Sequence, residues 1–295
     1  MTPCPAMRLL IVGGDSQLGS ALAAGARGQG WDVVATSRRD GAALPLDLSQ
    51  PLEQGPVLSS GVDVAVLCAA VAARKLCAEQ PELARRVNVD NTVALARRLA
   101  AAGVHVLLLS TSLVFDGLRP RMPANSPRHP IDPYGRFKAD AETGFQAVAP
   151  TGAILRLTKV IGPQTPLFAQ WLDTLRAGQP VTAFSDMTMA PISLDLAVSA
   201  MMALVAARPS GIFQVSAESD LSYGEAATYL AGRCGRAGLV RVVSALTCGF
   251  LPEHLPPYTS LAMDELTALS GLSAPLPRKA LDALLGDGAN TIRGM

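Results

Sequence analysis

The sequence predicts an α/β protein built on a Rossmann-type doubly wound parallel sheet, with a smaller C-terminal lobe. Short apolar runs alternate with helical patterns in the first half of the 295-residue chain, a glycine-rich turn follows the first run, and the alternation ends after Gly162. Strands that alternate with helices form parallel sheets that are covered on both faces. The expected strands are residues 8–12, 31–36, 62–68, 104–110, 153–157 and 211–216.

The expected helices supply the crossover connections between these strands. They span residues 17–29, 81–102, a stretch that begins near 133, 167–177 and 194–207. We therefore predict a Rossmann domain in residues 7–160, whose sheet is completed by about residues 190–218. Residues 161–189 and 219–295 are predicted to form the separate, smaller lobe.

The composition favours a globular protein and excludes several kinds of partner. Hydrophobic residues make up 49% of the chain and charged residues 17%, which indicates a large buried core. The net charge is +1, so no overall field favours nucleic acid or an anionic membrane. No apolar run reaches the roughly 18 residues that a membrane span needs, and residues 1–7 lack the pattern of a signal peptide. We expect a cytoplasmic protein, and a homodimer remains open.

The cysteines and histidines indicate neither a disulfide framework nor a metal site. Five cysteines are scattered without a CxxC pair, and three histidines lie far apart. We therefore expect free thiols, including Cys68 and Cys77, and no bound metal.

The turn after the first expected strand has the pattern of a phosphate-binding loop. Gly13 and Gly19 occupy the first and last positions of a G-x-x-G-x-x-G loop, and Ser16 occupies the middle one. Small residues let the chain turn tightly, let the backbone approach a pyrophosphate and let the helix pack on the sheet. An ordinary strand–helix turn is the alternative, but the place of this turn at the first strand favours dinucleotide binding. The predicted loop residues are Gly13, Ser16, Gln17, Leu18 and Gly19.

The end of the second expected strand favours NADP as the dinucleotide. An NAD-preferring site usually has an acidic residue there, whereas this chain has Ser37, Arg38 and Arg39. These groups suit a 2′-phosphate, and a solvated basic turn is the alternative. Asp47 and Leu48 end the next segment, where the carboxylate either accepts from an adenine amino group or belongs to a plain turn. NADP is thus the favoured cofactor, with NAD as the alternative.

A threonine at a strand end and a later Tyr/Lys pair indicate carbonyl chemistry. Thr111 follows the expected strand 104–110, and Tyr134 and Lys138 are four residues apart on an expected helix, so they share one face. Tyr134 can give a proton to a developing alkoxide, and Thr111 can hydrogen-bond the same oxygen. The Lys138 ammonium is expected to lower the pKa of Tyr134 and to contact a cofactor ribose. A surface tyrosine and a solvated lysine are the alternative to this pair alone, but its combination with the glycine loop is a strong signal.

These motifs resemble those of the extended short-chain dehydrogenase/reductases, and within them the dTDP-4-dehydrorhamnose reductase group. The resemblance implies that Thr111, Tyr134 and Lys138 are catalytic, and that the Rossmann domain binds NAD(P) while the lobe binds substrate. It also implies that Cys68, Ala69 and Ala70 lie along the cofactor. The resemblance spans nearly the whole chain and includes the Gly13 loop, residues 68–70, 87–92, 110–117, 133–138, 154–156, 186–193 and 257–261.

The substrate half departs from the pattern of that group. Ser112 and Leu113 stand where the group has Asp-Tyr, and Met187 stands where it has Gln. Lys159 stands where a tryptophan would line the sugar pocket. The candidate substrate-binding residues are therefore Ser112, Lys159 and Met187. Lys159 either meets a phosphate or carboxylate of a different substrate or snorkels at a strand end.

The resemblance implies an NADP-dependent reductase of a keto-sugar, namely a nucleotide-linked 4-keto sugar, with Tyr134 as the proton donor. A non-catalytic dinucleotide-binding subunit is one alternative, because the methionine adenosyltransferase regulatory subunit shares the resemblance and the substrate half departs from the pattern. A sugar-nucleotide epimerase is the other alternative. The complete Thr111, Tyr134 and Lys138 set favours the enzyme.

Overall fold

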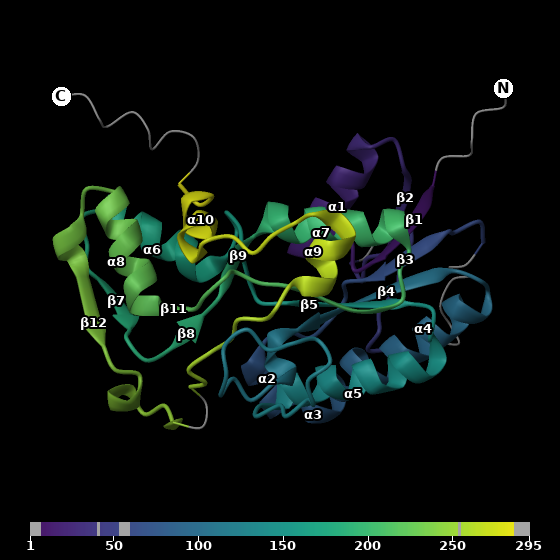
Figure 1. Ribbon diagram of the computed structural model, residues 1–295, viewed down its shortest axis with the longest axis horizontal. Helices are drawn as coiled ribbons and strands as arrows, with labels where there is room; N and C mark the ends of the chain where they lie inside the picture. The colour runs from purple at the N-terminus through teal and green to yellow at the C-terminus, as the bar shows by residue number, and fades with distance from the viewer. Residues whose placement is uncertain (1–6, 40–41, 53–59, 253–254, 286–295) are drawn as a thin grey trace.

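The computed structural model describes residues 7–39, 42–52, 60–252 and 255–285, and its centre is a six-stranded parallel sheet (Figure 1). The strand order is β10-β5-β4-β3-β1-β2. The chain runs from β1 to β2 on one side of β1 and then crosses over to β3 on its other side. The strand order thus reverses between β1 and β3, and a crevice opens beyond the carboxyl ends of these two strands. This order confirms the Rossmann-type fold. The strands are β1 (Arg8–Val12), β2 (Asp32–Ala35), β3 (Val64–Leu67), β4 (His105–Thr111), β5 (Ala153–Leu157) and β10 (Gly211–Val215).

Helices cover both faces of this sheet, as the continuous apolar strands require (Figure 1). On one face, α1 (Gln17–Gly28), α7 (Leu194–Ala207) and α9 (Asp264–Ser270) contribute to one hydrophobic core cluster with the strands. On the other face, α4 (Asn91–Ala101) and α5 (Pro133–Val148) contribute to a second cluster. Alternate strand residues face the two clusters, as Leu9 and Leu10 of β1 do.

The prediction of a single helix over residues 81–102 is wrong in detail. The structure has α2 (Arg74–Glu79), α3 (Pro81–Arg85), a π-helical turn (Arg86–Asp90) and then α4. The turn carries Asn88, whose side-chain oxygen accepts from the Val71 N–H at 2.8 Å and whose amide donates to the Val71 carbonyl at 3.0 Å. The widened turn thus directs a buried amide to the loop that follows β3.

The smaller lobe has a hydrophobic core cluster of its own. The cluster contains Phe168 and Trp171 from α6 (Pro166–Arg176) and Leu230 from α8 (Tyr223–Arg233). Short strands that the sequence did not predict pair as β7 with β12, β8 with β11 and β6 with β9. The remaining elements are β6 (Lys159–Ile161), β7 (Val181–Phe184), β8 (Thr188–Met189), β9 (Pro191–Ser193), β11 (Leu221–Ser222), β12 (Val240–Val243) and α10 (Pro277–Asp282).

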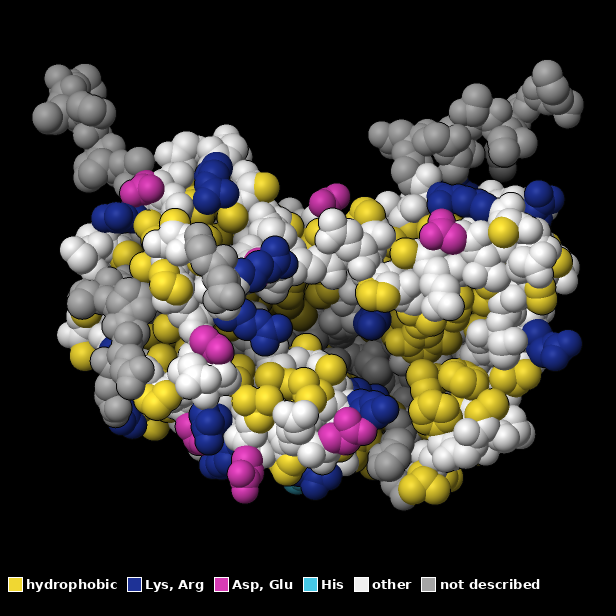
Figure 2. All heavy atoms as spheres, turned by 180° about the vertical axis from the view of Figure 1, so that it is seen from behind, with side chains coloured by type: hydrophobic (Ala, Val, Ile, Leu, Met, Phe, Trp, Pro, Cys, Tyr) yellow, Lys and Arg dark blue, Asp and Glu magenta, His cyan; other side chains and the backbone are white. Residues whose placement is uncertain are grey.

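The surface agrees with the near-zero net charge. On the face shown in Figure 2, basic and acidic side chains are interspersed over the larger half, and hydrophobic side chains gather on the smaller lobe. In the described part of the chain, no helix is long and apolar enough to cross a membrane.

A buried ion pair joins α5 to β5 beneath the carboxyl edge of the sheet. Arg156 and Glu142 are 1% and 0% exposed, and their side chains form two hydrogen bonds, of 2.9 and 2.7 Å. Ser110 donates to Glu142 at 2.5 Å, and Arg128 donates to it at 3.0 Å. Burial alone would raise the pKa of Glu142, but Arg156, Ser110 and Arg128 outweigh it and hold the pKa below its usual value.

Glu142→Gln is expected to destabilise the protein by about 3–5 kcal/mol at neutral pH, because it leaves the buried Arg156 without a counter-charge. The stability that Glu142 contributes is present above the pKa of an unfolded glutamate and is lost as the pH falls through its lower folded pKa. Urea unfolding of wild type and variant from pH 7 downward measures both effects. Arg176→Gln, which breaks the exposed pair with Asp173, is the control and should change stability by less than about 1 kcal/mol. An equally small effect of Glu142→Gln would contradict the importance of the buried pair.

Candidate active site

The glycine loop after β1 leaves no room for larger residues. Gly13 has a φ of +87°, and a Cβ there would lie 2.8 Å from the Ala69 backbone nitrogen. A Cβ at Gly19 would lie 2.3 Å from the Gly13 carbonyl oxygen. The loop therefore depends on these two glycines for its turn and for the close approach of α1.

The Ser16 side chain hydrogen-bonds within the loop itself. Its hydroxyl donates to the Gly13 carbonyl at 2.8 Å and accepts from the Gly19 N–H at 3.0 Å. Ser16 is thus the N-cap of α1, and it stiffens the loop.

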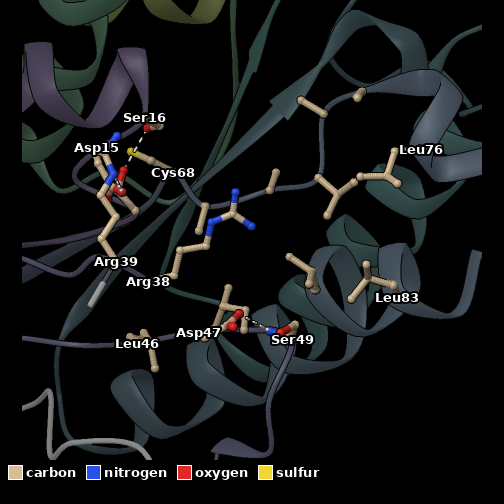
Figure 3. A pocket seen from close by; sticks show the side chains of 18 residues that line it. Asp15, Ser16, Arg38, Arg39, Leu46, Asp47, Ser49, Cys68, Leu76 and Leu83 are labelled. Carbon is tan, nitrogen blue, oxygen red and sulfur yellow. Dashed lines mark hydrogen bonds and ion pairs between the residues drawn. The ribbon is translucent and has the colours of Figure 1, made fainter. Parts of the chain in front are cut away.

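A cavity of about 520 Å³ lies against this loop, in the crevice predicted by the strand order (Figure 3). Nine of the predicted cofactor residues line it: Gly13, Ser16, Arg38, Arg39, Asp47, Leu48, Cys68, Ala69 and Ala70. Five others do not line it: Gln17, Leu18, Gly19, Ser37 and Lys138. The sequence interpretation missed nine further lining residues: Asp15, Leu46, Ser49, Val71, Ala72, Ala73, Leu76, Leu83 and Val87.

The two arginines at the end of β2 have different surroundings. In Figure 3 the Arg38 guanidinium extends into the cavity, and the described residues offer it no hydrogen bond or ion pair. Arg39 instead pairs with Asp15 at 3.2 Å, and the Ser37 hydroxyl donates to the same carboxylate at 3.0 Å. Asp15, inside the glycine loop, thus holds Arg39 and Ser37, whereas Arg38 has no such partner among the described residues.

The start of α5 brings Tyr134 close to the end of β4. Asp132 is the N-cap and accepts from the Gly135 N–H at 2.7 Å. A Cβ at Gly135 would lie 2.1 Å from the Leu113 carbonyl oxygen, so the first turn of α5 packs directly on the segment that follows Thr111. Glycine next to the tyrosine is therefore a requirement for this contact.

Lys138 lies deeper in the same helix. Its side chain is buried, and its ammonium donates to the Leu109 carbonyl of β4 at 2.5 Å. Loss of solvent lowers the pKa of Lys138 to about 8, against the opposing effects of Glu142 and Cys68.

The prediction that Lys138 lowers the pKa of Tyr134 is wrong, because the structure raises this pKa. Burial is the largest influence and raises that pKa, and Cys77 and Asp132 raise it further. Tyr134 is therefore a phenol at neutral pH, which is the form that can donate a proton.

A second, smaller cavity of about 210 Å³ contains Thr111 together with all three candidate substrate residues, Ser112, Lys159 and Met187. The structure thus joins a strand end of the central sheet to the smaller lobe at one site. The other lining residues are Arg74, Leu113, Thr158, Thr188, Met189, Tyr223, Leu255, Pro256 and Thr259. Among the described residues, no group of three or more His, Cys, Asp or Glu side chains could hold a metal ion.

This fold has a glycine loop beneath a cavity, Thr111 at the carboxyl end of β4, and Tyr134 and Lys138 on the adjoining helix α5, although neither of these two lines either cavity. It is the fold of an extended short-chain dehydrogenase/reductase, a class of NAD(P)-dependent oxidoreductases. The family model described as RmlD substrate binding domain matches residues 7–289, and the chain belongs to this family.

Individual relatives agree with this assignment. The chain is 28% identical over 283 residues to dTDP-4-dehydrorhamnose reductase from Sinorhizobium fredii, which covers 91% of this chain and 93% of that protein. It is 29% identical over 162 residues to methionine adenosyltransferase 2 subunit beta from Xenopus laevis, covering 54% of this chain and 48% of that protein. The structure superposes on dTDP-4-dehydrorhamnose reductase from Bacillus anthracis in complex with NADP with a TM-score of 0.84, at 19% identity and with coverage of 95% and 99%.

The thiols are expected to differ in reactivity as their surroundings differ. Cys68, Cys77, Cys234 and Cys248 form no disulfide, and Cys4 lies outside the described residues. Burial raises the pKa of Cys68 to about 12, whereas Cys248 is exposed. A colorimetric thiol reagent should therefore modify Cys248 rapidly, Cys68 slowly, and the fully buried Cys77 only on unfolding. In denaturant without reductant all five thiols should react, and a count of three would reveal a disulfide and contradict this expectation.

Proposed function

We propose that the protein is an NADP-dependent reductase of a keto-sugar, with a nucleotide as the carrier of the sugar. The observation that carries the proposal is the joint position of Thr111 and the lobe residues in one cavity, at the same sheet edge as the cofactor cavity. The full-length similarity to a dTDP-4-dehydrorhamnose reductase supports the reaction class.

The division of labour follows the predicted domains. Residues 7–160, completed by about 190–218, would bind the cofactor, and residues 161–189 and 219–295 would bind the substrate. We further propose a cytoplasmic location, and a homodimer as the assembly to test first.

The cofactor cavity suits NADP. The Gly13–Gly19 loop and the N-terminus of α1 would receive the pyrophosphate, and Arg38 would pair with the 2′-phosphate. Asp47 and Leu48 border the same cavity, where they would contact the adenine, and residues 68–70 would lie along the dinucleotide. The complex of the Bacillus anthracis relative with NADP supports this assignment, with NAD as the alternative.

The reaction proposed is the addition of a hydride and a proton across a carbonyl. NADPH, when bound, supplies the hydride to the carbonyl carbon. The Tyr134 hydroxyl gives its proton to the carbonyl oxygen as negative charge develops, and the Thr111 hydroxyl donates a hydrogen bond to the same oxygen. The Lys138 ammonium, fixed by the Leu109 carbonyl, stabilises the phenolate that Tyr134 leaves behind.

A non-catalytic dinucleotide-binding subunit is the second candidate. The similarity to methionine adenosyltransferase 2 subunit beta favours it, although that match covers 54% of the chain. A sugar-nucleotide epimerase is a further alternative within the enzyme class. Oxidation of NADPH by a panel of keto-sugar nucleotides distinguishes these three candidates, because only the reductase consumes one NADPH for each substrate molecule.

Tyr134→Phe is expected to lower kcat by about 10²–10⁴-fold with little change in NADPH affinity, because the proton is given only as the alkoxide develops. Stopped-flow kinetics and a cofactor titration measure the two effects. Thr111→Ala should also lower kcat, and Thr111→Ser should restore much of it because the hydroxyl remains. Lys138→Ala should weaken both turnover and cofactor binding. Full activity of Tyr134→Phe would contradict the proposed role of the phenol.

Arg38→Ala is expected to reduce NADPH affinity by about ten- to a hundredfold while NADH affinity changes little, because a charge-assisted contact to the 2′-phosphate is lost. Arg39→Ala is the matched control, and its effect should be smaller because Arg39 already pairs with Asp15. Isothermal titration of both cofactors measures these affinities. Equal affinities of wild type for NADPH and NADH would contradict the preference.

A further inference from the structure

The cavity beside Thr111 has a positive electrostatic character. Its described lining contains two cationic side chains, Arg74 and Lys159, and no carboxylate. The Arg74 guanidinium pairs with Asp132 at 2.8 Å, so much of its charge is compensated. Lys159 has no ion pair or hydrogen bond with any described residue, and it is the charge that remains available to a ligand.

Lys159 combines exposure with poor hydration of its ammonium. The residue is exposed at the start of β6, and it lines the cavity. Nevertheless, loss of solvent around the ammonium lowers the pKa of Lys159. A snorkelling lysine would place its ammonium in bulk water and keep its usual pKa. The side chain is therefore better explained as one that faces the cavity.

The neighbouring Thr158 supplies an independent indication of a ligand. Thr158 is 7% exposed, lines the same cavity, and its buried hydroxyl has no hydrogen-bond partner among the described residues. A buried polar group without a partner is costly unless something else binds it. A ligand in the cavity can supply that partner.

The position of Lys159 and the size of its cavity indicate that the anionic group it would bind belongs to the sugar of the substrate rather than to the nucleotide. Thr111 is paired with Leu157 in the β4–β5 register, and Lys159 follows two residues later. Its backbone is fixed by pairing with Pro191 of β9. The cavity is about 210 Å³, less than half of the 520 Å³ of the cofactor cavity, so its size suits one sugar ring.

We infer that the substrate is a keto-sugar whose ring carries a carboxylate, which the Lys159 ammonium and the Thr158 hydroxyl bind. This inference rests on the proposed function and names its substrate class. One uncompensated positive charge and one free hydroxyl match a singly charged carboxylate, whereas a phosphate ester with about two charges would call for more cations. The tryptophan that the family resemblance predicted at this position would serve a neutral sugar instead.

The test compares two ligands that differ only in this group, UDP-glucuronic acid and UDP-glucose. Isothermal titration into the NADP-loaded protein is expected to show tighter binding of the carboxylate form by about ten- to a hundredfold. Lys159→Met should abolish this preference, and Lys159→Arg should retain it. Lys279→Met, which removes an exposed lysine of α10 outside the cavity, should leave it unchanged.

Thr158→Val tests the second contact. It is expected to weaken binding of UDP-glucuronic acid without lowering the melting temperature of the free protein, because the hydroxyl has no partner there to lose. Destabilisation of the free protein without a change in affinity would show a structural role and remove Thr158 from the site.

The outcomes separate this inference from the proposed function. Equal affinity of wild type for the two ligands, or a preference that survives Lys159→Met, overturns the carboxylate site. If a neutral keto-sugar nucleotide is nevertheless reduced with NADPH, the proposed function is retained and only the carboxylate site is discarded. If neither ligand binds, the inference fails, and the absence of NADPH oxidation on every keto-sugar nucleotide would contradict the proposed function as well.

Discussion

The position of the candidate active site depends on the buried ion pair between Glu142 of α5 and Arg156 of β5. The first turn of α5 carries Tyr134, and the first neighbour of Thr111, Ser110, donates to the same Glu142 carboxylate at 2.5 Å. One carboxylate thus fixes both the helix that supplies the phenol and the strand that supplies the hydroxyl. The proposed reaction, in which Tyr134 and Thr111 act on one carbonyl oxygen, requires such a rigid arrangement because catalytic geometry tolerates little displacement.

The same network reaches segments that lie far away in the sequence. Arg156 donates to the Ala124 carbonyl at 2.9 Å and to the Gln214 side chain of β10 at 3.3 Å. The Gln214 amide donates in turn to the Met122 and Ala262 carbonyls, both at 2.9 Å. Met122 also takes part in an isolated β-bridge with Leu261, in which its carbonyl accepts from the Ala262 N–H at 3.1 Å. Buried polar side chains therefore tie these segments to the central sheet, and their mutual hydrogen bonds offset the cost of burying them.

The sequence could predict those features that local pattern determines. Apolar runs such as residues 64–67 predict buried parallel strands, and the spacing of Gly13 and Gly19 predicts the loop, because each signal is local. The π-helical turn escaped prediction because its cause is the contact of Asn88 with Val71, 17 residues away. The lobe strands have two to four residues and carry too little periodicity to be seen. The pairing of Asp15 with Arg39, and the raised pKa of Tyr134, depend on neighbours that only the folded chain brings together.

The burial of Lys138 bears on the choice between an enzyme and a binding subunit. A buried ammonium is costly, and a leucine or methionine could cover the sheet at that point of α5 without the cost. The structure retains the charge with a hydrogen bond to Leu109 and with Glu142 one turn further along the helix. A contact to the cofactor ribose needs only a hydrogen-bond donor at this place and does not need a group whose pKa is lowered. A lysine with a pKa of about 8, one turn along α5 from Tyr134, instead suits the proposed reaction, in which it would respond to the charge on the phenol during proton transfer. The cost of burying Lys138 is therefore better explained by chemistry than by binding alone.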